Sequence, residues 1–200
     1  MRSKGLLVLL VLALLAGLAG CAGCSTYNTL VEADETVARA WADLQAQYQR
    51  RADLIPNLVR TVEASATFER ETLEAVTNAR ARATAITLSV EDLSDPEKVR
   101  QFQEAQAQLS SALARLLAVA ENYPQLQTTE AFRDLLAQLE GTENRITVAR
   151  RDYNEAVRQY NIHVRRFPTM LVASLTGFRP KQPFEAAEGA QQAPQVQFDL

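Results

Sequence analysis

Residues 129–167 read TEAFRDLLAQLEGTENRITVARRDYNEAVRQYNIHVRRF and decide the fold, because they carry the longest helical pattern in the chain. Apolar side chains recur at intervals of three, four or seven residues, namely Phe132, Leu135, Leu139, Ile146, Tyr153, Val157, Tyr160 and Val164. Such spacing places them on one face of an α-helix. The stretch therefore predicts one long helix from about Thr129 to Phe167 that buries a single apolar stripe.

Three shorter helices are predicted before this one, at about residues 27–53, 56–87 and 94–123. Their apolar stripes are Leu30, Val37, Trp41, Leu44 and Tyr48, then Val59, Val62, Ala66, Leu73 and Val76, then Val99, Phe102, Leu109, Leu113, Leu116, Ala120 and Tyr123. Ile55 precedes Pro56 and is biased away from helix, so we expect the chain to turn or kink there. Ser94 and Glu97 match a capping box at the start of the third helix.

The predicted fold class is all-α, because β-branched residues never alternate with polar ones over a useful length. Four helices with short connections pack most simply as an antiparallel, up-down-up-down four-helix bundle, here with a long fourth helix. Residues 27–184 are expected to form this single domain, since the chain is long enough to bury one core. Residues 185–200 are rich in Gln, Ala, Glu and Pro, which predicts a disordered C-terminal tail.

Residues 1–20 have the pattern of a signal peptide or membrane anchor. Arg2 and Lys4 give a positive start to an unbroken apolar run over residues 5–18. That run is shorter than the roughly 20 apolar residues of a spanning helix. A processed export signal therefore fits the leader better than a transmembrane segment.

The end of this leader, Leu18-Ala19-Gly20-Cys21, looks like a bacterial lipobox. In such a motif the signal is cut before the cysteine, which then carries the acyl chains, and several chains on one cysteine make a stable anchor. We therefore expect lipid attachment at Cys21, with residues 21–26 as an acylated linker. Cys24 is the alternative site of attachment, although the residues before it lack the usual aliphatic side chain.

The two cysteines also have the C-x-x-C spacing of redox pairs and of half a zinc site. A structural zinc needs two further ligands, and the only histidine, His163, lies far along the chain. Metal oxidases built on helical bundles need Glu-x-x-His pairs on two helices, which a chain with one histidine does not supply. The Gly-x-Ser-x-Gly motif of serine hydrolases is also absent from the sequence. We therefore expect no catalytic residue, no metal and no cofactor, and the chain is not predicted to be an enzyme.

Loss of Arg2 and Lys4 with the leader would leave 19 basic residues against 24 acidic ones. An acidic chain is a poor ligand for nucleic acid. The expected partners are therefore the membrane, through the lipid anchor, and an unidentified membrane or envelope protein. The pattern favours no particular oligomeric state.

Four charged residues fall on or beside the stripes of the second and fourth helices, namely Glu69, Arg80, Glu143 and Arg150. At inward positions they would form an interior polar layer that fixes the register of the helices. At the edges of the stripes they would stay in water, as charged side chains usually do. The sequence is compatible with both interpretations.

The end of the fourth helix and the segment after it combine apolar residues with cations, a composition that suits a lipid headgroup layer. If the first helix points away from the anchor, the fourth returns toward the membrane. The residues of this predicted membrane-proximal contact are Arg165, Arg166, Met170, Leu171, Phe178, Arg179 and Lys181. The alternative is that the segment folds back to cover the open end of the core near Leu30 and Val31.

The pairs Tyr153-Asn154 and Tyr160-Asn161 repeat at an interval of seven residues. That interval places both tyrosines on one face of the helix and both asparagines next to it. Packed tyrosines whose hydroxyls reach a partner explain the repeat, and a ligand site is the alternative.

Several motifs resemble those of the LemA family. They are residues 27–31, Ala40-Trp41, residues 50–59, 121–124 and 139–146, both Tyr-Asn pairs, Phe167-Pro168 and residues 177–180. The resemblance extends from Tyr27 to Phe184. It implies a membrane-attached helical bundle that faces the outside of the inner membrane and has no established catalytic activity. A longer transmembrane helix is common at the start of such proteins, whereas the cysteines here favour lipid attachment.

These patterns together predict a membrane-anchored, non-catalytic helical-bundle protein of the bacterial cell envelope. Its bundle would face the periplasm or the exterior and serve as a scaffold or accessory to a membrane partner. The alternative is a periplasmic bundle that binds a lipid, a peptide or a small molecule. A continuous stripe of medium-sized side chains argues against a ready cavity for such a ligand.

Overall fold

The computed structural model of the chain describes the backbone of residues 2–64 and 68–185, and the side chains from Cys24 onward within those ranges. This part of the chain contains helices and no strand, so the predicted all-α class is confirmed. The α-helices are α1 (Arg2–Glu63), α2 (Arg70–Ala85), α3 (Pro96–Ala120), α4 (Pro124–Gln127), α5 (Glu130–Arg165) and α6 (Thr169–Thr176). A short 3-10 helix, η1, spans Asp92–Ser94.

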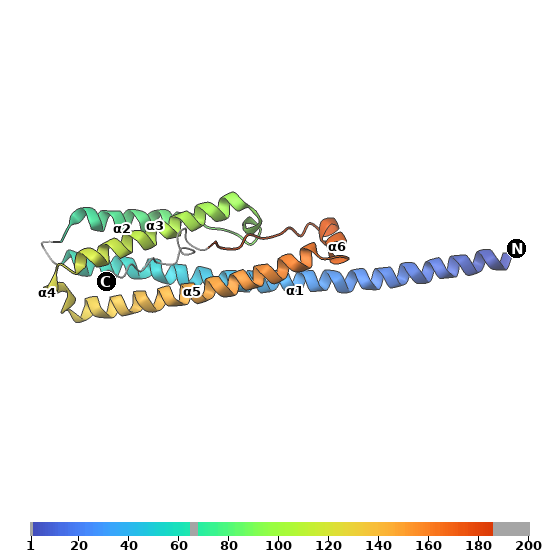
Figure 1. The fold of residues 1–200 in the computed structure, drawn as a ribbon, viewed down its shortest axis with the longest axis horizontal. Coiled ribbons are helices and arrows are strands. Elements are labelled where there is room, and N and C mark those ends of the chain that lie inside the picture. The colour runs from blue at the N-terminus through green and yellow to red at the C-terminus, as the bar shows by residue number, and fades with distance from the viewer. Residues whose placement is uncertain (1, 65–67, 186–200) are drawn as a thin grey trace, which may run out of the picture.

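The four long helices α1, α2, α3 and α5 lie lengthwise beside one another and alternate in direction (Figure 1). Helix α5 packs along α1, and α2 packs along α3. At one end, which we call the leader end, α1 continues alone toward residue 2, and α6 lies beside it (Figure 1). The short α4 lies at the opposite end, which we call the far end. The fourth predicted helix, residues 129–167, corresponds closely to α5.

Helix α1 runs unbroken through Pro56 to Glu63, so the predicted turn at Ile55-Pro56 is wrong. The chain turns instead between α1 and α2. Ile55, Leu58 and Val62 follow one another at intervals of four residues or fewer, and each is at most 1 % exposed. Burying each of these side chains stabilises the fold by about 1.5–3 kcal/mol. Together they offset the cost of a proline inside a helix, which is about 3 kcal/mol.

Helix α3 begins at Pro96 with Asp95 as its capping residue, so the predicted capping role of Ser94 is wrong. The Asp95 carboxylate accepts hydrogen bonds from the backbone N–H groups of Glu97 (3.0 Å) and Lys98 (3.3 Å). Aspartate caps a helix as well as serine does. Pro96 favours the first helical position, where its missing N–H is not needed, and this places the cap one residue before it.

Buried apolar side chains form two clusters along the length of the molecule. The cluster near the leader end contains Leu30, Val37, Trp41, Leu44, Tyr48, Val99, Phe102, Ile146, Tyr153, Val157, Tyr160, Val164, Ala173 and Phe184, among others. The second includes Ile55, Leu58, Val62, Leu73, Val76, Leu109, Leu113, Leu116, Phe132 and Leu139. The predicted stripes of the first and fourth helices are therefore buried, except that Leu135 is only half-buried.

The chain reverses direction after α5 and returns along it. Helix α6 ends at Thr176 and is capped by Gly177, whose φ of 84° is the left-handed conformation that glycine adopts most easily at a helix C-terminus. Residues 178–185, which we call the strap, then run back beside α5 without regular secondary structure (Figure 1). Apart from Glu185, the predicted disordered tail of residues 185–200 lies outside the described residues.

The leader forms the first part of α1, and its backbone is helical and continuous with the rest of that helix. The side chain of Cys21 lies outside the described residues, whereas Cys24 is an exposed, free cysteine. No helix in the described part of the chain has an apolar stretch long enough to cross a membrane.

Candidate functional site

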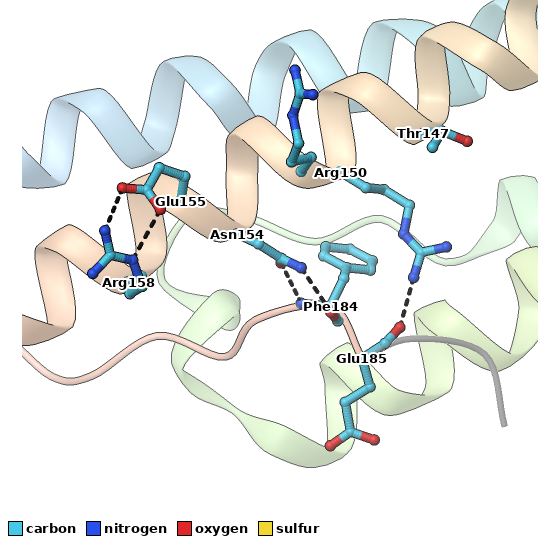
Figure 2. Close-up of a pocket in the computed structure, with 8 residues that line it drawn as sticks. Thr147, Arg150, Asn154, Glu155, Arg158, Phe184 and Glu185 are labelled. Carbon is cyan, nitrogen blue, oxygen red and sulfur yellow. Dashed lines mark hydrogen bonds and ion pairs between the residues drawn. The ribbon is translucent and has the colours of Figure 1, made fainter. Parts of the chain in front are cut away.

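The strap is fastened to α5 by the two asparagines of the repeated Tyr-Asn pairs. Asn161 Nδ2 donates to the carbonyl of Lys181 (2.8 Å), and Asn161 Oδ1 accepts from the N–H of the same residue (2.9 Å). Asn154 makes the corresponding two bonds with Phe184, at 2.9 and 2.8 Å (Figure 2). Each asparagine side chain thus pairs with both backbone groups of one strap residue.

The seven-residue interval of the asparagines matches the step of an extended chain. Asn154 and Asn161 are separated by about 10.5 Å along α5, at 1.5 Å per residue. Lys181 and Phe184 are three residues apart, which is about 10 Å in an extended chain at ~3.3 Å per residue. The two intervals agree, so both asparagines reach equivalent backbone groups. The strap runs antiparallel to α5, because its later residue meets the earlier asparagine.

The two tyrosines of the repeat lie beneath the strap and also bind its backbone. Tyr153 donates its hydroxyl hydrogen to the carbonyl of Gln182 (2.9 Å), and Tyr160 donates to the carbonyl of Arg179 (3.0 Å). Both side chains are buried. The repeat therefore consists of packed tyrosines whose hydroxyls have partners, as the simpler interpretation of the sequence expected.

The burial of these tyrosines predicts that the protein loses stability in alkali. Burial raises the pKa of Tyr153 and Tyr160 above its ordinary value, and it raises the pKa of Tyr48 as well. Unfolding exposes the tyrosines, whose pKa is then about 10. Because the folded pKa is the higher one, the stabilisation is complete below about pH 10 and declines as the pH rises toward the folded pKa.

We expect the urea midpoint of unfolding, followed by circular dichroism, to fall steadily above about pH 10. Tyr153→Phe removes one of the three groups, so its midpoint should start lower and then decline less steeply with pH. A variant that declines as steeply as the parent chain would show that Tyr153 does not contribute to the alkaline loss.

The strap ends in an aromatic cluster that belongs to the core. The centre of the Phe184 ring lies 5.1 Å from that of Tyr153, 5.9 Å from that of Trp41 and 6.1 Å from that of Phe102. Only 4 % of Phe184 is exposed. Such ring pairs stabilise a core beyond the area that they bury. The strap is thus part of the packed interior and not a loose extension.

A buried arginine of α1 lies at the centre of a polar cluster that joins three helices. Arg51 Nη1 donates to Glu143 Oε1 of α5 (2.9 Å) and to Ser110 Oγ of α3 (2.9 Å), and Nη2 donates to Gln106 Oε1 of α3 (2.6 Å). Arg51 is 2 % exposed, and its Nε has no hydrogen-bond partner among the described residues. A buried charge must be paired and hydrogen-bonded, so this cluster fixes how α1, α3 and α5 align.

The spacing of residues in the sequence could have identified Arg51 as buried, but the expected turn at Pro56 argued against it. Tyr48, Arg51, Ile55 and Leu58 follow one another at intervals of three or four, so Arg51 lies on the continuing stripe of α1. Because the first helix was expected to stop before Pro56, the stripe ended at Tyr48 and the arginine was missed.

The structure does not bring the four residues of the predicted polar layer together. Glu143 joins the Arg51 cluster described above. Arg150 is half-buried, and its guanidinium lies 5.6 Å from the centre of the Phe184 ring (Figure 2). Arg80 is half-buried and donates to a backbone carbonyl of α1 (2.7 Å). Glu69 is exposed at the start of α2.

Open grooves border the end of the strap. One, of about 530 Å³, is lined by Arg51, Gln106, Ser110 and Glu143 together with residues around them. The other, of about 490 Å³, lies along α5 beside Phe184 (Figure 2). The side chains that line both grooves offer hydrogen bonds and charge. Among the described residues, no group of three or more histidine, cysteine or acidic side chains could hold a metal ion.

The leader end of the molecule presents an exposed apolar face on and next to α6. The exposed fractions are 73 % for Phe167, 47 % for Met170, 52 % for Leu171 and 87 % for Leu175. The opposite side of α6 packs against the core through the buried Ala173, and α6 contacts both α1 and α5. One face of α6 therefore covers the core, as one of the two interpretations of the sequence expected, and the other face is open to solvent.

The remaining residues of the predicted membrane-proximal contact divide in the same way. Arg165, Arg166 and Arg179 are exposed. Phe178 is half-buried, and its ring centre lies 5.9 Å from that of Tyr27.

The predicted membrane contact of Lys181 is wrong, because its side chain is buried and unavailable to a membrane. It forms an ion pair with Asp34 of α1, and its Nζ lies 4.9 Å from the centre of the Tyr160 ring. The aliphatic stem and the charge of this lysine are therefore both used inside the fold, where they fasten the strap to α1.

Fold and site define a protein made of long helices, closed by a C-terminal strap and exposing an apolar helix at the leader end. The chain belongs to the LemA family, whose model matches residues 40–198, and this confirms the resemblance drawn from its motifs.

Magnetosome proteins are among its relatives. Magnetosome proteins MamQ 1 and MamQ 2 of Paramagnetospirillum magneticum are each 27 % identical to it over 175 residues, which are 80 % of this chain and 64 % of theirs. Magnetosome protein MamQ of Magnetospirillum gryphiswaldense is 24 % identical over 169 residues, 76 % of this chain and 62 % of its own. The chain thus spans less than two thirds of the length of these relatives.

Proposed function

We propose that the chain is a membrane-anchored, non-catalytic four-helix bundle of the bacterial cell envelope that serves as a scaffold or accessory to a membrane partner. The observation that carries this proposal is the continuity of α1, which runs without a break from the leader at Arg2 into the core at Val62. Membership of the LemA family supports the same reading.

A continuous helix joins anchor and bundle without a flexible linker. An anchor at Cys21 would therefore fix the height of the bundle above the lipid, because each residue of α1 adds about 1.5 Å. Proteins that hold a partner at a membrane benefit from such a fixed geometry. The bundle would face the periplasm or the exterior, since export of the chain follows from the signal pattern.

Mass spectrometry of the mature N-terminus tests the anchor. We expect the native chain to begin at Cys21 and to carry the mass of acyl chains, and we expect it in the membrane fraction. Cys21→Ser should lose both the acyl mass and the cleavage after Gly20, whereas the matched variant Cys24→Ser should keep both. A native chain that begins at Met1, carries no acyl group and stays in the aqueous fraction would refute the proposal.

Chemical cross-linking followed by affinity purification of the anchored chain tests the scaffold role. One defined membrane protein should co-purify in amounts comparable to the chain. Recovery of a lipid or small metabolite without any protein would instead favour the alternative, a ligand-binding bundle.

A further inference from the structure

We propose that α6 lies in the headgroup layer of the membrane and gives the bundle a second, non-covalent contact with lipid beside its anchor. The inference rests on the proposed function, because it takes the leader end as the anchored end. It adds a lipid-binding surface, formed by the exposed apolar side chains on and next to α6.

The side chains of α6 divide into an open, apolar side and a covered side. At 100° per residue, Met170, Leu171 and Leu175 share one side of the helix, and Ala173 lies on the other. The open side is apolar and exposed, while the covered side packs on the core. Phe167, just before α6, adds the second most exposed of these apolar side chains.

Helix α6 lies a short distance from the proposed anchor. Tyr27 of α1 contacts Phe178, which directly follows α6 and its glycine cap. Tyr27 comes six residues after Cys21, which corresponds to about 9 Å along a helix. Interfacial helices bury their apolar face about 5–10 Å into the boundary between headgroups and acyl chains. The headgroup layer is roughly 5–8 Å thick on each side of the hydrocarbon core. An anchor at Cys21 therefore brings α6 to the outer edge of that layer, which its exposed apolar face can enter.

The charged residues at this end lie beside α6 and not on it. Helix α6 contains no charged residue, and α1 contains none between Lys4 and Glu32. The exposed Arg165, Arg166 and Arg179 flank α6 on both sides in the sequence. Cations beside an apolar surface favour anionic headgroups. The chemistry of this end thus matches a bilayer surface containing anionic lipid.

Fluorescence quenching by brominated lipids tests the inference on the full chain with its anchor. Leu175→Trp places a reporter on the most exposed apolar position, where the larger side chain needs no repacking. The chain is bound to mixed phosphatidylcholine and phosphatidylglycerol vesicles whose acyl chains carry bromine near the headgroups. We expect the emission of this variant to be quenched several-fold more than that of the parent chain, whose only tryptophan, Trp41, is buried.

Gln125→Trp is the matched control, because Gln125 is exposed in α4 at the far end of the molecule. Its emission should resemble that of a reporter in water and stay unquenched. Adding Arg165→Gln and Arg166→Gln to the Leu175→Trp chain should weaken quenching on anionic vesicles.

If the chain floats with the vesicles but Leu175→Trp is no more quenched than Gln125→Trp, the inference is wrong while the proposed anchor stands. If the reporter shifts to the blue without lipid, in a manner that depends on protein concentration, α6 binds a second copy of the chain and the inference is wrong. If the parent chain does not float, the proposed function fails and the inference falls with it.

Discussion

Phe184→Ala is expected to lower the free energy of unfolding by about 3–5 kcal/mol, the usual cost of truncating a buried phenylalanine. The ring touches aromatic side chains of α1, α3 and α5, and Arg150 lies over it. No neighbouring side chain can collapse into the space, because the surrounding rings are held by the helices that carry them. The strap would lose the side chain that holds its end in the core.

Equilibrium unfolding in urea measures this loss, and the melting temperature should fall by roughly 10 °C in a chain of this size. Phe167→Ala is the matched control, because it makes the same chemical change at a side chain that is 73 % exposed. That variant should stay within about 0.5 kcal/mol of the parent chain. Equal losses for the two variants would mean that Phe184 does not pack in the core in solution.

Hydrogen exchange provides a second measurement on the same variant. The N–H groups of Lys181 and Phe184 are bonded to asparagines of α5. In Phe184→Ala these amides should exchange faster than in the parent chain, while amides in the middle of α3 keep their relative protection. Faster exchange confined to the strap would identify it as a unit that opens by itself.

Glu143→Gln is expected to destabilise the protein by about 3 kcal/mol, because it leaves the buried charge of Arg51 without a counter-charge. The side chain of Arg51 is almost wholly buried, whereas that of Glu143 is about half exposed. The loss should therefore lie at the low end of the range for buried pairs. The amide keeps the size of the carboxylate, so packing around it changes little.

Glu140→Gln serves as the control, since Glu140 lies one turn earlier on α5 and is exposed. Its stability should be nearly unchanged. Adding Arg51→Met to Glu143→Gln removes the unpaired charge and should recover much of the lost stability. If the double variant is less stable than Glu143→Gln, the cost comes from the hydrogen bonds of Arg51 to Gln106 and Ser110 and not from its charge.

The helices with strong periodicity were predictable from sequence, whereas the boundary between the first two predicted helices was not. The stripe of α5 placed that helix within two residues at each end, because eight apolar positions agreed on one face. At Pro56 a local preference argued for a turn, but the burial of Ile55 and Leu58 was worth more. The same error hid Arg51, since a stripe that ends at Tyr48 gives no reason to place an arginine inside.

The strap and α6 were less predictable, because their structure depends on distant partners. The Tyr-Asn repeat indicated that something binds along α5, but the strap has no periodicity that would identify it as the partner. Lys181 looked like a surface cation because its partner, Asp34, is far away in sequence. For α6 the sequence offered two alternatives, and one side of this short helix covers the core while the other is exposed. Contact of the exposed side with lipid stays a prediction.

The fastening of the strap has a consequence for how freely its sequence can vary. Asn154 and Asn161 bind main-chain N–H and C=O groups, which every amino acid except proline supplies. The N–H groups of residues 181, 182 and 184 are all used, and residue 183, which falls between them, is a proline with no N–H to place. Substitutions at Pro183 should therefore be tolerated far better than those at Phe184. Sequence divergence among related proteins is expected to concentrate at strap positions, such as 183, to which neither asparagine forms a hydrogen bond.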